Sequence, residues 1–244
     1  MISLEQALES IFKGLRGIVL DIGCGTGRNI KLLEKVSPRL TCIIGLDIDI
    51  VKLRRALKLI SGEITSFICG STSSLPLRSQ SVNVITTTLM FHELSGELVD
   101  PTLCEVWRVL KEEGKFIVAD KIMFKPSSPS EELTLLTEKA YHRALLYAKG
   151  IKTWGLRRER ELIEKVSTKG FRLSSKLKAR GKVLKSEEFL NMWGKETLRL
   201  LSEIDNIEKK KDIESLVNKI KRIASKHEYG PSRILVAVFR KCVH

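Results

Sequence analysis

The sequence lacks several features that would each indicate a different class of protein. Its apolar runs are short, far below the ~20 residues of a membrane-spanning helix. The five cysteines are an odd number and form no Cys-x-x-Cys pair, which disfavours both a disulfide framework and a zinc site. Only 6% of the residues are aromatic, which weakens the case for a surface that stacks nucleic-acid bases. We therefore expect no membrane span, no disulfide and no metal.

The N-terminal residues and the cysteines indicate a reducing compartment. The first five residues do not have the basic-then-apolar layout of a secretory signal. Cys42 and Cys69 fall in apolar, strand-like runs, so we expect buried and reduced thiols. The sequence accordingly predicts a cytoplasmic protein.

The charge is positive and unevenly distributed along the chain. The formal net charge is +14, with 15 Lys and Arg against 14 Asp and Glu in residues 1–124 and 28 against 15 in residues 125–244. Residues 139–185 alone hold 15 basic residues and 3 acids. Such a cluster indicates an anionic small molecule, RNA or an acidic protein as a partner, and a solvated basic surface is an equally good interpretation.

Apolar strands alternate with helical patterns through the first half of the chain. The alternation is typical of βαβ units and a parallel sheet, and nearly continuous apolar strands suit a sheet covered on both faces. Ligands of such sheets bind beyond the carboxyl ends of the strands. The pattern predicts strands at residues 17–21, 41–47, 66–69, 82–87 and 115–120, and helices at residues 28–36, 51–60 and 100–111.

Beyond residue 124 the pattern is looser and more helical. We predict helices at residues 131–148, 156–169 and 186–226, and strands at residues 171–178 and 234–240. The charged run at residues 208–212 is expected to break the last helix or to form an exposed face. Residues 186–226 therefore predict a helical hairpin inserted before the last strand, which packs on the sheet or forms a homodimer face.

A glycine-rich turn after the first strand is the most informative motif. Residues 19–27 read Val-Leu-Asp-Ile-Gly-Cys-Gly-Thr-Gly, a buried strand that ends in a turn. Glycine has no Cβ and tolerates positive φ, so the backbone can approach a ligand closely. The spacing is Gly-x-Gly-x-Gly with Arg28 next, whereas the dinucleotide fingerprint is Gly-x-Gly-x-x-Gly or Ala. The spacing argues against a nicotinamide enzyme, although an acid at the end of the second strand would serve its ribose equally well.

Four features occur in a fixed order along residues 15–124. They are Asp21 before the glycine turn, Asp47 at the end of the second strand, residues 70–77 after the third strand and residues 110–118 leading into the fifth. This order resembles the class I S-adenosylmethionine-dependent methyltransferases, especially the branch of the ubiquinone and menaquinone biosynthesis methyltransferases.

The resemblance implies a fold and a domain organisation. The expected fold is α/β, a doubly wound and mostly parallel seven-stranded sheet whose last strand is antiparallel, with helices on both faces. A helical insertion precedes the last strand. Residues 1–244 are expected to form a single methyltransferase domain, within which residues 125–230 are the acceptor-side cover and the helical insertion.

The resemblance also implies S-adenosylmethionine as cofactor and assigns roles to residues. Asp47 would accept both ribose hydroxyls, and Asp21 would attract the α-ammonium group directly or through water. Ile48 would pack on the adenine. Ser71 stands where the family usually has an acid, so with Thr72 it would bind the adenine without a charge-assisted hydrogen bond. The expected cofactor-binding residues are Asp21, Gly23, Cys24, Gly25, Gly27, Asp47, Ile48, Gly70, Ser71, Thr72 and Leu89.

His92 is the candidate catalytic residue. Residues 88–93 follow the fourth strand, and in the resembled family this segment borders the methyl group. His92 could orient or deprotonate an acceptor hydroxyl or amine, or it could only bind a loop or line the cofactor. Glu93 is expected to cap a helix or to face solvent.

Three functions are consistent with the sequence. The first is methyl transfer to a small molecule, which the basic second half predicts to be anionic. The second is methylation of RNA, with the basic segment gripping phosphates. The third is a non-catalytic subunit that binds a partner through the helical insertion, which the intact Asp21, Asp47 and loop glycines disfavour.

Overall fold

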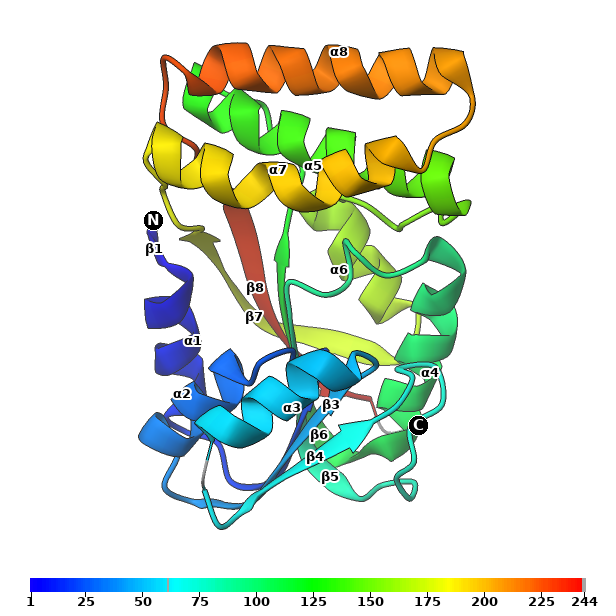
Figure 1. Cartoon of the computed structure of the whole chain (residues 1–244). Helices are drawn as coiled ribbons and strands as arrows, with labels where there is room; N and C mark the ends of the chain where they lie inside the picture. Colours follow the sequence, from blue (N-terminus) through cyan, green and yellow to red (C-terminus); the bar gives the residue numbers. More distant parts are fainter. Residues whose placement is uncertain (61, 243–244) are drawn as a thin grey trace.

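A mostly parallel β-sheet runs through the computed structural model, which describes residues 1–60 and 62–242 (Figure 1). Over these residues the sheet has eight strands in the order β1-β7-β8-β6-β5-β2-β3-β4. Only the pairs of β8 with β6 and β7 are antiparallel within this range. The strands are β1 (Ile2–Ser3), β2 (Gly17–Ile22), β3 (Leu40–Asp47), β4 (Thr65–Cys69), β5 (Val82–Thr88), β6 (Leu110–Lys121), β7 (Phe171–Arg180) and β8 (Arg233–Lys241).

The predicted fold class is confirmed, with one strand more than expected. The added strand is β1, a two-residue strand that pairs in parallel with the edge of β7. The other seven strands form the expected doubly wound sheet with its last strand antiparallel. The carboxyl ends of β2, β3, β4, β5 and β6 meet at one edge of this sheet, as parallel pairing requires.

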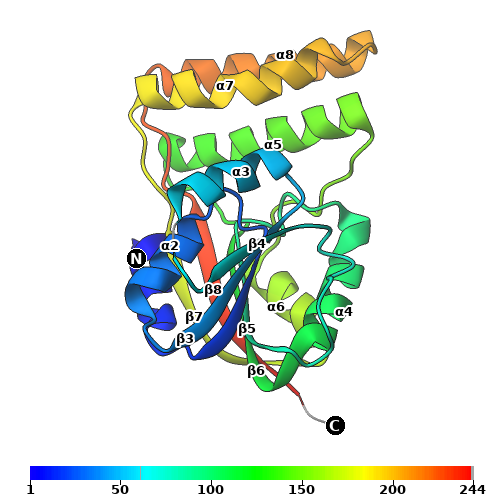
Figure 2. The ribbon, with the colours of Figure 1, turned by 60° about the horizontal axis from the view of Figure 1, so that its bottom comes forward.

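Helices cover both faces of the sheet because its strands are apolar on both sides (Figure 2). Successive strand residues point to opposite faces, so Val19 packs into one buried cluster and Leu20 into the other. The first cluster includes side chains of α1 (Leu4–Phe12), α2 (Arg28–Val36) and α3 (Ile50–Leu59). The second includes side chains of α4 (Val99–Val109), which the short helix η1 (Gly96–Leu98) precedes, and of α6 (Glu159–Ser167).

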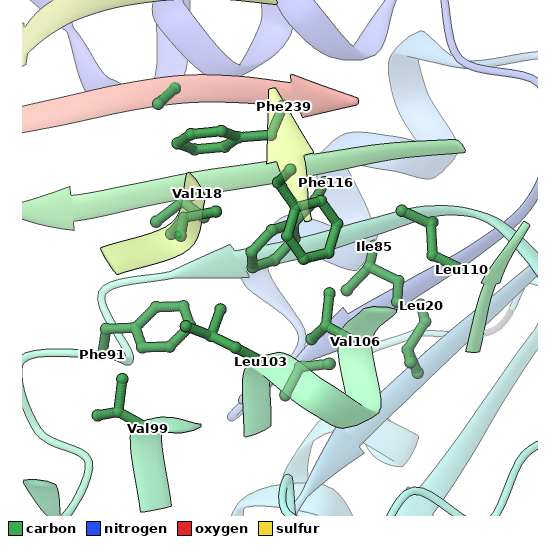
Figure 3. Close-up of a cluster of buried hydrophobic side chains, with 14 of the residues drawn as sticks. Leu20, Ile85, Phe91, Val99, Leu103, Val106, Leu110, Phe116, Val118 and Phe239 are labelled. Atoms are coloured by element: carbon green, nitrogen blue, oxygen red, sulfur yellow. The ribbon is translucent and has the colours of Figure 1, made fainter. Parts of the chain in front are cut away.

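The second cluster is the larger and contains the aromatic centre of the sheet (Figure 3). Phe116 is fully buried on β6 and lies against Phe239 of β8 and Phe171 of β7, with ring centroids 6.3 Å and 5.4 Å away. Phe91, in the segment after β5, is also 98% buried and meets Phe116 edge-on at 6.4 Å. Each buried phenylalanine stabilises the fold by about 1.5–3 kcal/mol. The core therefore anchors the loop that carries His92.

Three helices form a separate layer above the carboxyl ends of the strands (Figure 1). They are α5 (Pro129–Lys149), α7 (Ser186–Ser202) and α8 (Ile207–Ala224), and we call them the helical layer. Their apolar side chains form two clusters that are distinct from those of the sheet. The predicted helical insertion before the last strand is confirmed, but α7 and α8 pack on α5 rather than on the sheet.

Of the two alternatives predicted for residues 208–212, a break or an exposed face, the structure agrees with the exposed face. The chain leaves the helix at residues 203–206, and Asn206 caps α8 by accepting a hydrogen bond from the Lys209 backbone N–H. The charged run at residues 208–212 lies in the first turns of α8 and is mostly exposed. The break between α7 and α8 lies where Asn206 can cap a new helix. The charged run that follows did not interrupt the helix.

Residues 125–230 contain more than a cover. Besides the helical layer, this range contributes β7 to the sheet. It also contributes α6, which packs on the same face of the sheet as α4. Both elements are continuous with the main core, since Phe171, Leu162 and Val166 are buried in it. Among the helices that the structure describes, none is long and apolar enough to cross a membrane.

The cysteines are all free in the structure, but their burial differs from the prediction. Cys24 is buried, Cys42 is half-buried and Cys69 is exposed. Cys69 ends β4, which is the edge strand of the sheet, so one side of this apolar run has no covering element. The apolar pattern identified the strand correctly and overestimated its burial.

Candidate active site

A cavity of about 310 Å³ lies at the carboxyl ends of the parallel strands. We call it the first cavity. It is bounded by the glycine turn, the end of β3, the segment after β4 and the segment after β5. Its lining residues are Gly23, Gly25, Asp47, Ile48, Lys52, Ser71, Thr72, Leu89, Met90, Glu93, Leu94 and Leu98.

The glycine turn is fixed to β3 and leaves one face open. The backbone N–H groups of Gly23 and Cys24 donate to the Leu46 carbonyl at 2.7 Å and 3.0 Å. Gly25 has a φ of +54°, and a Cβ built on it would meet no heavy atom of a distant residue within 4 Å. The backbone there borders the cavity directly, which suits the close approach of a ligand.

Asp47 ends β3 beside the segment that follows β4, and two backbone N–H groups hold its carboxylate. Its Oδ2 accepts a hydrogen bond from the Gly25 backbone N–H at 2.8 Å, and its Oδ1 accepts one from the Asp49 N–H at 2.9 Å. The residue is 8% exposed and lines the cavity. Each carboxylate oxygen can accept a second hydrogen bond. The carboxylate therefore keeps acceptor capacity beside the cavity, which is compatible with the hydroxyls of a ribose.

Asp21 is fully buried beneath the glycine turn, and neither carboxylate oxygen makes a hydrogen bond of ordinary geometry within the described residues. Burial raises the pKa of Asp21 to about 7; the Asn29 side chain opposes this shift and the Asp47 carboxylate adds to it. A buried carboxyl group without a partner is costly unless a ligand supplies one. The α-ammonium group of S-adenosylmethionine has the matching charge, so the residues present fit this cofactor.

The predicted adenine contacts also line the first cavity. Ile48 is 76% exposed at the rim of the cavity, so its side chain is free to cover a ring. The Ser71 hydroxyl is 2.9 Å from that of Ser73, and the Thr72 hydroxyl is 2.7 Å from that of Thr102. These local hydrogen bonds fix both hydroxyls at the wall of the cavity.

Four predicted cofactor-binding residues do not line the first cavity. Asp21 lies beneath its wall. The Cys24 side chain is buried against the core, and burial strongly raises the pKa of its thiol. A Cβ on Gly27 would lie 2.2 Å from Ile60, so Gly27 allows α2 to approach α3. Gly70 joins β4 to the lining segment, with its N–H donating to the Asp47 carbonyl. These four residues therefore support the segments that line the cavity. Because the Cys24 side chain is buried, only its backbone is available to a ligand.

His92 is buried beside the first cavity and does not line it. It is 1% exposed, its Nδ1 lies 2.5 Å from Asp120 Oδ1, and its backbone N–H donates to Asp120 Oδ2 at 3.0 Å. Its Nε2 has no hydrogen-bond partner among the described residues and lies 3.8 Å from carboxylate oxygens of Glu93 and Glu138. Burial lowers the pKa of His92, but Asp120 more than offsets it, so the pKa is raised.

A second cavity of about 590 Å³ lies between the strand ends and the helical layer. It shares Lys52 and Glu93 with the first cavity, so these two residues mark the junction of the two. The sequence pattern did not predict its walls, which come from six separate segments. The lining residues are Asp49, Lys52, Glu93, Lys121, Thr137, Glu138, Tyr141, Trp193, Glu196, Thr197 and Tyr229.

Carboxylates outnumber basic groups on the walls of the second cavity, with four acids against two lysines. Lys121 is paired with Glu138 at 2.6 Å and Lys52 with Asp49 at 3.8 Å. The position of Asp120 and Lys121 at the end of a predicted strand could have indicated both residues. That strand, β6, pairs in parallel with β5, which precedes His92. The residues on α5 and α7 carried no such signal, because only the packing of the helical layer brings them to this edge.

The comparisons with known proteins agree with this geometry. Residues 20–118 match the family model described as a methyltransferase domain. A proposed methyltransferase from Bacillus halodurans C-125 has a similar structure, with 16% identity, a TM-score of 0.66 and coverage of 98% of this chain and 99% of that one. The YcgJ protein of Bacillus subtilis shares 20% identity, with a TM-score of 0.63 and the same coverage of 98% and 99%.

A third similar structure is a proposed methyltransferase in complex with the Trm112 methyltransferase activator of Haloferax volcanii. The identity is 18%, the TM-score is 0.60, and the alignment covers 98% of this chain and 88% of that one. No curated protein matches the sequence significantly. At these identities the structural likeness concerns the fold, and the family match covers the segment that builds the first cavity.

Proposed function

Because residues 20–118 form a class I S-adenosylmethionine-dependent methyltransferase domain, we propose that the chain methylates a small molecule bound in the second cavity. One observation carries this proposal. The second cavity shares Lys52 and Glu93 with the cavity that fits the cofactor, so an acceptor held there would lie next to the methyl donor. Its volume of about 590 Å³ is that of a small-molecule site.

The chain's own residues bind and orient the reactants. S-adenosylmethionine supplies a methyl group already activated on a sulfonium, so the protein contributes mainly position and exclusion of water. Asp47 holds the ribose, Asp21 holds the α-ammonium and the open face of Gly25 admits the backbone of the cofactor. The helical layer supplies the opposite wall of the second cavity, where the acceptor would bind.

His92 is proposed as a positioning residue. Its side chain reaches neither cavity, and its Nδ1 is committed to Asp120. The raised pKa favours its imidazolium form near neutral pH. An imidazolium 3.8 Å from Glu93 and Glu138 holds both carboxylates near the junction of the two cavities, which is a role in geometry rather than in direct proton transfer.

The distribution of charge favours a small molecule over RNA. The basic residues of the second half lie largely outside the second cavity, and some are paired, such as Lys176 and Lys178 with Glu159 at 2.6 Å and 2.9 Å. The cavity walls themselves carry more carboxylates than ammonium groups. They therefore give no support to the anionic acceptor that the sequence predicts, nor to a phosphate backbone, which needs clustered cations.

Two calorimetric titrations and one labelling experiment test the proposal. S-adenosylmethionine and S-adenosylhomocysteine are expected to bind the folded protein. Incubation with methyl-labelled cofactor and fractionated cell extract is expected to place the label in the small-molecule fraction. Failure of both cofactors to bind at about 1 millimolar would reject methyl transfer, and label in RNA would reject the acceptor class while retaining the enzyme class. We further propose that the chain acts as one domain, in the cytoplasm, where its free thiols stay reduced.

A further inference from the structure

Glu93 occupies the junction of the two cavities, where an acceptor atom would meet the methyl group. It lines both cavities and follows β5 by five residues, in the loop that Phe91 anchors to the core. The side chain is 56% exposed, so it remains available to a ligand and to solvent. The sequence predicts a capping or solvent-facing role for this residue, and its exposure agrees with the solvent-facing alternative. Its place in the linings of both cavities is an additional feature that the sequence did not indicate.

Glu93 is also the carboxylate of the second cavity that makes no ion pair with a lysine or an arginine among the described residues. Glu138 is paired with Lys121, Asp49 with Lys52 and Glu196 with Arg199 at 2.6 Å. Over the part of the chain that the structure describes, the one ion-pair contact of Glu93 is with the His92 Nε2 at 3.8 Å. A cationic ligand would supply the missing partner.

Three aromatic side chains surround the same space. Trp193 and Tyr229 line the second cavity, and each stacks on Phe189, with ring centroids 5.7 Å and 4.6 Å away. Tyr141 of α5 lines the same cavity, and burial together with the charge of Glu93 raises the pKa of its hydroxyl. Aromatic faces attract organic cations and offer nothing comparable to anions.

Resting on the proposed methyltransferase function, we propose that the acceptor is a small organic amine and that Glu93 binds its ammonium form and takes its proton. The neutral amine then forms a new N–C bond with the methyl group while the S–C bond breaks, and the electron pair of that bond stays on sulfur. The proton passes from Glu93 to water, since the side chain is partly exposed. The aromatic walls hold the hydrocarbon part of the amine.

Binding of three compounds of one size and different charge tests this inference without turnover. Phenethylamine, phenylacetate and 2-phenylethanol are titrated into the protein saturated with S-adenosylhomocysteine, and the heat of binding is measured. We expect phenethylamine to bind at least about tenfold more tightly than phenylacetate, because one charge interaction of about 1.4 kcal/mol corresponds to that ratio. Equal or tighter binding of phenylacetate overturns the inference, as does failure of phenethylamine to bind at about 10 millimolar.

A pair of variants assigns the preference to one side chain. Glu93→Gln keeps the size and removes the charge, and we expect it to reduce the preference for phenethylamine to less than about threefold. Glu97→Gln removes an exposed carboxylate from the short helix η1 that follows, outside both linings, and is expected to leave the preference unchanged. An unaltered preference in Glu93→Gln overturns the role of Glu93. Because S-adenosylhomocysteine binding is measured first, loss of the cofactor site is distinguished from failure of the amine inference.

Discussion

The two cavities lie side by side at one edge of the sheet, yet they are built in different ways. The first cavity is lined by residues between 23 and 98, nearly all of them in turns that directly follow parallel strands. The second cavity is lined by residues between 49 and 229 and depends on two helices of the helical layer. The first site is therefore encoded locally and the second by long-range packing. We expect substitutions in one to leave the other largely intact.

The largest expected effect concerns the buried carboxyl group of the first cavity. In the folded protein the pKa of Asp21 is raised from 3.8 to about 7, so between these values the folded state binds more protons than the unfolded state. Stability therefore falls as pH rises through this window, by about 4 kcal/mol in total. Asp21→Asn removes this loss, and its unfolding free energy in denaturant is expected to exceed that of the wild type most strongly at pH 8.

The same substitution should weaken binding of S-adenosylhomocysteine, because the α-ammonium loses its counter-charge. Asp205→Asn, at an exposed position between α7 and α8, is a control that should follow the wild-type pH dependence. If the unfolding free energies of wild type and Asp21→Asn changed in parallel between pH 5 and pH 8, ionisation of Asp21 would not destabilise the free protein, and the prediction would be wrong.

The next effect is on cofactor affinity at the other end of the first cavity. Asp47→Ala removes the proposed acceptor of both ribose hydroxyls and also frees the Gly25 and Asp49 N–H groups. Hydrogen bonds to a charged group are worth about 1.5–3 kcal/mol each, so we expect the dissociation constant for S-adenosylhomocysteine to rise about 100-fold or more. Calorimetry measures it directly.

Asp49→Asn is the matched control for this substitution. Asp49 lies two residues further along, lines the second cavity and caps α3 by accepting from the Val51 and Lys52 N–H groups. Asparagine caps helices about as well as aspartate, so affinity for S-adenosylhomocysteine should change less than about twofold. A similar loss of affinity in both variants would contradict the division between the two cavities.

A substitution in the helical layer tests whether the second cavity can be altered without an effect on the first. Trp193 packs in both apolar clusters of the layer and lines the second cavity. Since the side chain is only partly buried, Trp193→Ala should destabilise the layer by about 2 kcal/mol, less than for a fully buried ring. It should reduce methylation of the acceptor and leave the binding of S-adenosylhomocysteine unchanged. Hydrogen exchange of α7 and α8 amides measures the first effect, and calorimetry checks the second.

The smallest effect is expected for an ion pair within the layer. Arg143 of α5 donates two hydrogen bonds of 2.9 Å to the Asp212 carboxylate of α8, and both side chains are more than one third exposed. Exposed pairs contribute about 0.2–1 kcal/mol, so Arg143→Ala should lower the melting temperature slightly and leave both sites intact. A loss of cofactor binding in this variant would show that the layer and the first cavity are coupled.

The difference between the cavities also explains what the sequence could predict. The order of Asp21, the glycine turn, Asp47 and Ser71 reflects strand ends that are adjacent in a parallel sheet, so short-range pattern sufficed to predict the fold and most of the first cavity. Burial was harder to predict. Cys69 is exposed because β4 is an edge strand, and His92 is enclosed because Asp120 and α5 pack over it. These outcomes depend on which elements become neighbours, and periodicity alone carries no such information.

The separate apolar clusters of the helical layer have a consequence for how such a chain can change. The layer completes its own core from α5, α7 and α8 and contributes only a few side chains, such as Tyr141 and Trp193, to the shared space. A chimera that exchanges these three helices for those of a methyltransferase of similar fold would retain an intact glycine turn and both strand-end aspartates. Replacement of α5, α7 and α8 together can therefore change the preference for the acceptor, while the site for the methyl donor stays the same.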